Sequence, residues 1–139
     1  MNKTSIRQMR KVDLKDVSTI MKEAFNSVDQ GWSLKDSKIY IDEHQKCSFR
    51  LIAEKESKIV GFLIGDKDVD TLIIHSIGVL PEHMGKGIGK ALWEGALKYA
   101  RNSKLDNIRL VADPKSEAFM WYKRMGLKEN GWVEMEAKL

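Results

Sequence analysis

The sequence predicts an α/β protein built on a mixed β-sheet, and three observations support this. Apolar residues recur at helical spacing in three segments, a cap residue indicates a weaker fourth helix, and apolar residues alternate or run continuously in segments predicted as strands. These segments follow the order β-α-α-β-β-β-α-β-α-β, which combines hairpins with crossover connections. Composition is uniform along the 139 residues, with no linker or repeat. We therefore expect a single domain over residues 1–139.

The first part of the chain predicts a strand followed by two helices. The strand is expected over residues 5–9, and Asp13 can cap the helix that follows it. Ser33 can cap a second, weaker helix that runs to about residue 44. The first helix has an apolar stripe at spacings of three and four residues, formed by Val17, Ile20, Met21, Ala24 and Phe25.

A meander of three strands is expected next. Residues 49–54 alternate between apolar and polar, which is typical of a half-buried strand. Residues 59–64 form a continuous apolar run suited to a central strand. The third strand covers residues 71–79, where Gly78 predicts a bulge or a close approach of the backbone to a neighbour.

The second half of the chain predicts two helices, and each is followed by a strand. Residues 88–102 carry an apolar stripe at helical spacing, and residues 108–112 are expected to form a strand. A further helix over 118–125 is closed by Gly126, a residue typical of helix C-termini. Alternation of apolar and polar residues predicts a last strand over 132–137.

Several protein classes are excluded by composition. No apolar run approaches the ~18 residues that a membrane span needs, so no membrane partner is expected. The first eleven residues lack the apolar core of a signal peptide. Cys47 is the single cysteine, so an intramolecular disulfide is impossible. These features favour a reducing, cytoplasmic location.

Positive charge gathers in the second half of the chain. Between His83 and Arg124 there are nine Lys and Arg against four Asp and Glu, a net of +5. The whole chain carries +4, so the remaining residues carry −1. This asymmetry favours an anionic partner for the segment, although charge alone leaves open a set of solvated helix faces without a ligand.

A glycine-rich segment lies between an apolar strand and an amphipathic helix, at residues 83–90 with the sequence His-Met-Gly-Lys-Gly-Ile-Gly-Lys. Glycines let backbone amides approach a ligand, and amides at a helix N-terminus favour a phosphate. The segment fails as a Walker A loop, which needs glycine at Leu80. It also fails as a dinucleotide fingerprint, which needs Gly or Ala at Lys90 or Leu92. A tight turn without a ligand is the alternative.

Residues 77–92 resemble the pyrophosphate-binding loop of the GNAT family of N-acetyltransferases, [Gln/Arg]-x-x-Gly-x-[Gly/Ala] after a bulged strand. Three other segments are similar to family motifs in the family's order. Residues 6–25 resemble its first strand and helix, residues 58–62 its third strand, and residues 122–127 its Tyr-x-x-x-Gly-Phe signature. The resemblance thus extends over nearly the whole chain.

This resemblance implies a GNAT-like fold and acetyl-CoA as co-substrate, with no metal. The cofactor would lie between two parallel strands that splay apart at Gly78–Val79 and at residues 109–111, with the Val79 amide stabilising the developing oxyanion. Two positions depart from the family pattern: Met84 replaces Gln or Arg, and Lys115 replaces an Asn. The implied cofactor-binding residues are Ile77, Gly78, Val79, Met84, Gly85, Lys86, Gly87, Ile88, Gly89, Lys90 and Lys115.

The resemblance also implies direct acetyl transfer with two catalytic side chains. Tyr122 matches the family tyrosine that protonates the leaving thiolate, although it also fits a core position on its helix. His75 lies on a strand where some family members place a base, although a histidine in an apolar strand is also a common structural residue. Asp66, Asp68 and Asp70 alternate like a calcium loop but lack its glycine and glutamate, so no metal is expected.

The acceptor is expected to be a primary amine, either a small molecule or a peptide amine, bound by a monomer or homodimer. By the resemblance, residues 25–40 would shape its groove, including Asp29, Trp32 and Tyr40. Two alternatives belong to other classes. A non-catalytic acyl-CoA sensor would keep the loop without turnover, and a basic nucleic-acid-binding module lacks the aromatic residues and motifs such modules show. No nucleic-acid partner is therefore expected.

Overall fold

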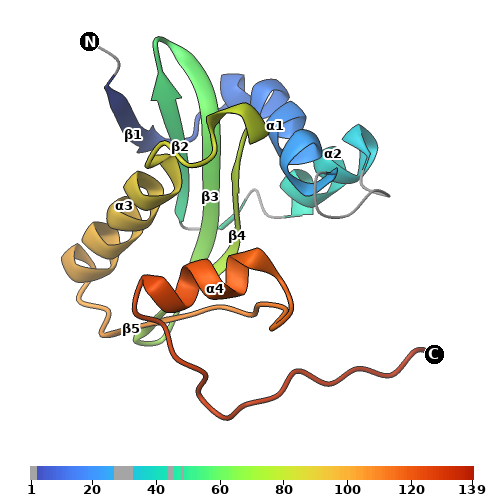
Figure 1. Cartoon of the computed structure of the whole chain (residues 1–139), viewed down its shortest axis with the longest axis vertical. Helices are drawn as coiled ribbons and strands as arrows, with labels where there is room; N and C mark the ends of the chain where they lie inside the picture. Colours follow the sequence, from blue (N-terminus) through green and yellow to red (C-terminus); the bar gives the residue numbers. More distant parts are fainter. Residues whose placement is uncertain (1–2, 27–32, 44–45, 48) are drawn as a thin grey trace. The chain divides into compact units, whose positions relative to one another are not determined.

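The computed structural model describes residues 3–26, 33–43, 46–47 and 49–139. The chain forms two compact units, residues 1–109 and residues 110–139. Among the described residues, the first unit contains the sheet and three α-helices, and the second contains one α-helix (Figure 1). Among the described helices, none has the length and apolar character that crossing a membrane requires.

The first unit is organised around a five-stranded mixed sheet, as the sequence predicts (Figure 1). The strand order is β1-β2-β3-β4-β5, with antiparallel pairing throughout except for the parallel pair of β4 with β5. Its strands are β1 (Thr4–Gln8), β2 (Phe49–Lys55), β3 (Lys58–Asp68), β4 (Thr71–Val79) and β5 (Asn107–Arg109).

Helices α1 (Leu14–Asn26) and α3 (Ile88–Asn102) cover opposite faces of this sheet, and α2 (Leu34–Glu43) packs against α1. On one face, Gly95 of α3 lies against Leu51. On the other, Phe25 of α1 makes an edge contact with the ring of Phe62, at 6.1 Å between ring centroids. Because side chains alternate along a strand, from Gly61 onward the odd-numbered residues of β3 face α3 and the even-numbered ones, such as Phe62, face α1.

Residues 59–65 of β3 are all buried, which explains the continuous apolar run in the sequence. A strand covered by helices on both faces has no solvent side on which to place polar residues. The prediction of a central strand at this position is confirmed.

Helix α1 begins differently from the sequence prediction, which made Asp13 its cap. Asp13 instead ends a short 3₁₀ turn, Lys11–Asp13, and its buried carboxylate accepts hydrogen bonds from Arg7 at 2.8 and 2.9 Å and from the Arg10 amide at 2.6 Å. Arg7 also pairs with Glu54 of β2. The carboxylate therefore ties β1 to the start of α1, and its hydrogen bonds with Arg7 lower the pKa of Asp13.

The capping prediction for Ser33 is confirmed, since its hydroxyl accepts a hydrogen bond from the Asp36 amide at 3.1 Å, at the start of α2.

The second unit contains α4 (Glu117–Arg124), which begins where the Ser116 hydroxyl accepts the Phe119 amide. Gly126 ends it with φ +102°, as predicted.

The strand predicted over 108–112 is shorter, since β5 stops at Arg109. The strand predicted over 132–137 is wrong: this segment is not a strand, and Trp132 and Met135 are each 88% exposed. Alternation alone does not make a strand, because a strand also needs a neighbour to pair with its backbone.

Candidate functional site

The carboxyl-terminal part of β4 forms an unpaired edge of the sheet. The parallel ladder with β5 covers only Thr71, Leu72 and Ile73, and in the described part of the chain residues 74–79 pair with β3 alone. The Leu80 amide donates to the Val60 carbonyl of β3 at 2.9 Å. Successive amides point to opposite sides of a strand, so the Val79 amide points away from β3, toward the open edge.

Gly78 lies where β4 passes close to its neighbour. A Cβ atom at this position would meet the ring of Phe62 at 2.6 Å and Ala24 of α1 at 3.3 Å. Only glycine fits this approach, which confirms one of the two predictions for this residue. The bulge itself lies elsewhere, at His75, because Ile64 pairs with Ser76 and Gly65 pairs with Ile74.

The glycine loop follows β4 through a 3₁₀ turn, Pro81–His83. Gly85 and Gly87 have φ angles of +76° and +83°, which side chains with a Cβ rarely adopt. No described atom lies within 4 Å of the position that a Cβ would take at either residue. These two glycines therefore serve the turn of the backbone, and the space beside them is open to a ligand.

Helix α3 begins directly at this loop, with Gly87 as its N-cap residue and no side-chain cap. The first hydrogen bond within the helix runs from the Ala91 amide to the Gly87 carbonyl. The amides of Ile88, Gly89 and Lys90 precede that bond, so the helix itself offers them no acceptor. Three amides at the positive end of a 15-residue helix have the chemistry that suits a phosphate.

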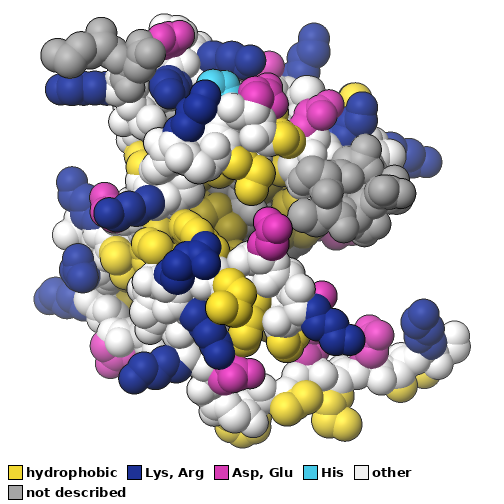
Figure 2. Space-filling view, viewed as in Figure 1, with side chains coloured by type: hydrophobic (Ala, Val, Ile, Leu, Met, Phe, Trp, Pro, Cys, Tyr) yellow, Lys and Arg dark blue, Asp and Glu magenta, His cyan; other side chains and the backbone are white. Residues whose placement is uncertain are grey.

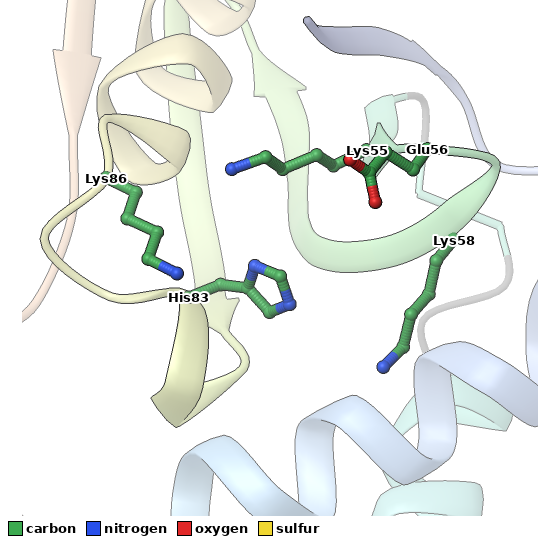
Figure 3. Close-up of a pocket in the computed structure, with 5 residues that line it drawn as sticks. All are labelled: Lys55, Glu56, Lys58, His83 and Lys86. Carbon is green, nitrogen blue, oxygen red and sulfur yellow. The ribbon is translucent and has the colours of Figure 1, made fainter. Parts of the chain in front are cut away.

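A basic pocket of about 400 Å³ lies beside the loop, between it and the β2–β3 turn. Figure 3 shows Lys86 and His83 reaching into it from the loop side, opposite Lys55, Glu56 and Lys58 of the turn. His83 Nδ1 is buried and has no hydrogen-bond partner in the described chain. Three ammonium groups against one carboxylate favour an anion in this pocket.

Elsewhere the charges are more evenly spread. Figure 2 shows Lys and Arg side chains over much of the visible face, with Asp and Glu among them. At the loop, Lys86 and Lys90 are exposed beside the first amides of α3. Met84, which departs from the family pattern, is 60% exposed, so its side chain is available to solvent or ligand rather than to the core.

His75 lies at the β4 bulge and is exposed. In a regular strand His75, Ile73 and Ile77 would share a face, but the bulge prevents this. Ile73 pairs with Asp66 and faces α1, whereas Ile77 pairs with Leu63 and faces α3. The bulge shifts the alternation between them, and it leaves His75 on the same side as Ser76 and Asp66.

Two further side chains meet His75 on this face. The ligand atoms of Cys47, Asp66 and His75 all lie within 4.8 Å of one another. Burial and the charge of Asp66 raise the pKa of the Cys47 thiol, and Arg50 of β2 opposes this shift. Tyr40 of α2 lies close to this group, because Ser76 and Cys47 both affect its phenol. Burial and Cys47 raise the pKa of that phenol, and a side-chain hydrogen bond with Ser76 lowers it.

Tyr122 and Lys115 belong to the second unit. Tyr122 lies on α4, where its ring meets Trp121 edge-on at 5.3 Å between centroids. Burial raises the pKa of the Tyr122 phenol, so the protonated form is retained well above neutral pH. Lys115 is exposed in the turn before α4, and its amide donates to Asp113 at 2.9 Å.

Sequence reasoning identified the loop but missed two features of the site. Lys55 and Lys58 carry no motif, and they join the pocket only because the β2–β3 turn lies beside the loop. Cys47 and Asp66 were not grouped with His75, because spacings of 19 and 9 residues match no ligand pattern. Asp29 and Trp32, expected near the acceptor, lie outside the described residues.

Comparisons with known proteins point to one family. The profile of the acetyltransferase (GNAT) family matches residues 14–127. An uncharacterized N-acetyltransferase of Methanocaldococcus jannaschii is 27% identical over 152 residues, which covers 97% of this chain and 67% of the relative.

Two solved structures illustrate the shared fold. An aminoglycoside N-acetyltransferase in complex with CoA is 17% identical, with a TM-score of 0.79 over 99% of this chain and 96% of that chain. The ribosomal-protein-S18-alanine N-acetyltransferase of Escherichia coli is 20% identical, with a TM-score of 0.74 over 89% of this chain and 77% of that chain. At these identities the structures establish the common fold.

Proposed function

We propose a direct acetyl transfer to a primary amine for this chain, which belongs to the acetyltransferase (GNAT) family and is an acetyl-CoA-dependent N-acetyltransferase. The family profile covers both compact units, and we take residues 1–139 as one acetyltransferase domain. The acceptor amine belongs either to a small molecule or to a peptide.

The observation that carries the proposal is the set of backbone amides at the end of β4 and at the start of α3. The first amides of α3 are suited to the pyrophosphate of acetyl-CoA, with Lys86 and Lys90 beside them. The Val79 amide points to the open edge, where it can donate to the thioester carbonyl. A donor aimed at an oxygen that becomes negative in the transition state typically contributes ~10²–10³-fold in rate.

Two proton transfers accompany the reaction. At pH 7 an alkylamine with a pKa of about 10.4 is only ~1 part in 2,500 neutral, which costs about 4.6 kcal/mol. We assign the removal of this proton to His75, which is exposed on the same side of the sheet as Tyr40 and Asp66. We assign protonation of the departing thiolate to Tyr122, whose phenol is protonated at neutral pH and whose pKa burial raises further.

The departure at Met84 is compatible with this function. A side chain at this position supplements the backbone amides, which form the phosphate site by themselves. Lys115 adds a cation to the turn before α4, where the family often has an amide side chain.

The test is release of free thiol from acetyl-CoA in the presence of amines. A panel of polyamines, aminoglycosides and short peptides with free N-termini covers both acceptor classes. We expect amine-dependent thiol release, with mass spectrometry showing one acetyl group on the accepted amine. Tight acetyl-CoA binding without thiol release for any amine would instead favour the acyl-CoA sensor.

The role of His75 has its own test in the same assay. His75→Ala should lower kcat by ~10²-fold, the usual contribution of a positioned base. Added imidazole should restore part of the lost rate, which it would not do for a residue that only stabilises the strand. An unchanged kcat would exclude His75 as the base.

A further inference from the structure

The β4 bulge brings together three side chains that no sequence motif connects. Cys47 precedes β2, Asp66 lies near the end of β3, and His75 is the extra residue of β4. In a regular strand His75 would pair with a residue of β3 and shift Ser76 to the other face. The bulge instead leaves His75 beside Ser76 on the face that carries Asp66.

These side chains offer a thiol sulfur, a carboxylate oxygen and an imidazole nitrogen. Each pair of these atoms is separated by no more than 4.8 Å. Donors around a tetrahedral Zn²⁺ lie about 2.0–2.3 Å from the ion and therefore ~3.3–3.8 Å from one another. Side-chain rotations that shorten these separations by about 1 Å would bring the three atoms to this spacing.

The surroundings are also compatible with a cation. The Lys67 amide donates to Asp66 Oδ1 at 2.9 Å, which fixes the direction of the carboxylate. A bound thiolate and carboxylate would neutralise a divalent ion. Burial and the charge of Asp66 raise the pKa of the Cys47 thiol and Arg50 opposes this shift, so metal binding must displace the thiol proton. His75 is exposed and the other two residues are half-buried, so an ion can enter and keep one open position.

We propose that Cys47, Asp66 and His75 form a binding site for a divalent transition-metal ion of the Zn²⁺ type. The three donor types are those that Zn²⁺ and Co²⁺ accept, and a thiol is a poor ligand for Mg²⁺ or Ca²⁺. The sequence alone predicts no metal, because Asp66, Asp68 and Asp70 lack the glycine and glutamate of a calcium loop and no motif connects Asp66 with Cys47 and His75.

Metal binding at this site would have a consequence for acetyl transfer, and this consequence rests on the proposed role of His75. The nitrogen that coordinates the ion is then unable to accept the proton of the amine. Zn²⁺ should therefore inhibit acetyl transfer, and a chelator should reverse the inhibition.

The direct test uses the metal alone, without acetyl-CoA or an amine. Titration of the full chain with Co²⁺ should produce a near-ultraviolet band from thiolate-to-cobalt charge transfer. Because Cys47 is the single cysteine, this band identifies its sulfur as a ligand. Isothermal titration with Zn²⁺ should give one site per chain.

Variants separate the three ligands from the rest of the surface. Cys47→Ser should abolish the Co²⁺ band, and Asp66→Asn and His75→Ala should each weaken Zn²⁺ binding at least ~10-fold, the smallest loss seen even for residues that only support a ligand. Asp68→Asn and His83→Ala are the matched controls outside the cluster and should keep the wild-type affinity.

Two results would overturn the site: no Co²⁺–thiolate band in the wild-type chain, or Zn²⁺ affinity unchanged in Cys47→Ser and His75→Ala. Circular dichroism of each variant shows that it is folded. Because none of these readouts uses acetyl transfer, failure of the metal site and failure of the proposed function are distinguishable. Metal binding without inhibition would retain the site and remove the consequence for His75.

Discussion

Two regions along β4, one of which continues into the start of α3, offer a ligand very different chemistry. At its carboxyl end, the Val79 amide and the first amides of α3 are backbone groups, positioned by Gly78, Gly85 and Gly87. At its bulge, the cluster of Cys47, Asp66 and His75 consists of side chains from three separate segments. The first region depends on the course of the chain, and the second depends on which residues the strands bring together.

This difference decides how each region responds to substitution. A backbone site tolerates an unusual side chain such as Met84, provided that the glycines keep the turn. A side-chain cluster loses a donor with every change. The two regions can therefore be separated by variants that alter one and leave the other intact.

The largest effect is expected from Gly87→Glu, which breaks the backbone region. The new side chain adds a negative charge at the phosphate site and occupies a position with φ +83°, so acetyl-CoA binding should fall at least ~100-fold. Gly131→Glu is the matched control, since Gly131 has φ +85° and equally open space outside the loop. Isothermal titration measures both, and equal affinities would show that the loop does not hold the cofactor.

Tyr122→Phe should lower kcat by ~10²-fold and leave the KM for acetyl-CoA nearly unchanged. Phenylalanine keeps the ring contact with Trp121 and removes only the hydroxyl. Tyr99→Phe is the control, because Tyr99 also stacks on an aromatic ring, that of Phe49. Steady-state kinetics of the two variants checks this, and wild-type kcat in Tyr122→Phe would remove the phenol from the reaction.

A purely structural effect should arise at Asp13, away from both regions. Asp13→Asn replaces a buried carboxylate that Arg7 binds, so the free energy of unfolding at pH 7 should fall by about 2 kcal/mol. Acetyl-CoA affinity should not change. Urea denaturation and titration measure the two quantities.

The same substitution has a defined pH dependence. The folded-state pKa of Asp13 is lowered, so its stabilising contribution is complete above the unfolded value of about 3.9 and is lost as pH falls through the folded value. The stability difference between wild type and Asp13→Asn should therefore shrink below pH ~4. A difference that stays constant down to pH 3 would contradict the assigned ion pair.

The smallest effect is expected from Met84→Arg, which adds a side chain to the backbone region. A guanidinium beside the phosphate site should tighten acetyl-CoA binding by about 1 kcal/mol, or ~5-fold. Met120→Arg on α4 is the control, since Met120 is exposed to a similar extent. Titration of both variants is the measurement, and a weaker affinity in Met84→Arg would mean that Met84 itself contacts the cofactor.

Much of the fold could be predicted from the sequence because its signals are local. The apolar stripe of α3, the buried run of β3 and the helix end at Gly126 each depend on a few neighbouring residues. The last strand was wrongly predicted for the opposite reason: whether residues 132–137 form a strand depends on a pairing partner, which their alternation does not specify.

The site divides in the same way. The glycine loop is a continuous segment, so a phosphate site could be proposed from residues 83–90 alone. The meeting of Cys47, Asp66 and His75 requires the β3–β4 register and its shift at Ile64 and Gly65, and this shift has no sequence signature of its own. Gly78 was noticed as anomalous, but the physical cause is the ring of Phe62 rather than a bulge.

The central claim is that the amides at the end of β4 and the start of α3 hold acetyl-CoA, and a thermal shift tests it most directly. The chain is heated with acetyl-CoA, CoA, NAD or ATP at equal concentration. At about 100 times Kd a ligand adds ~2.7 kcal/mol to stability, which raises Tm by several degrees in a domain of this size. We predict a rise with both CoA species and none with NAD or ATP; no rise with either CoA species would contradict the account.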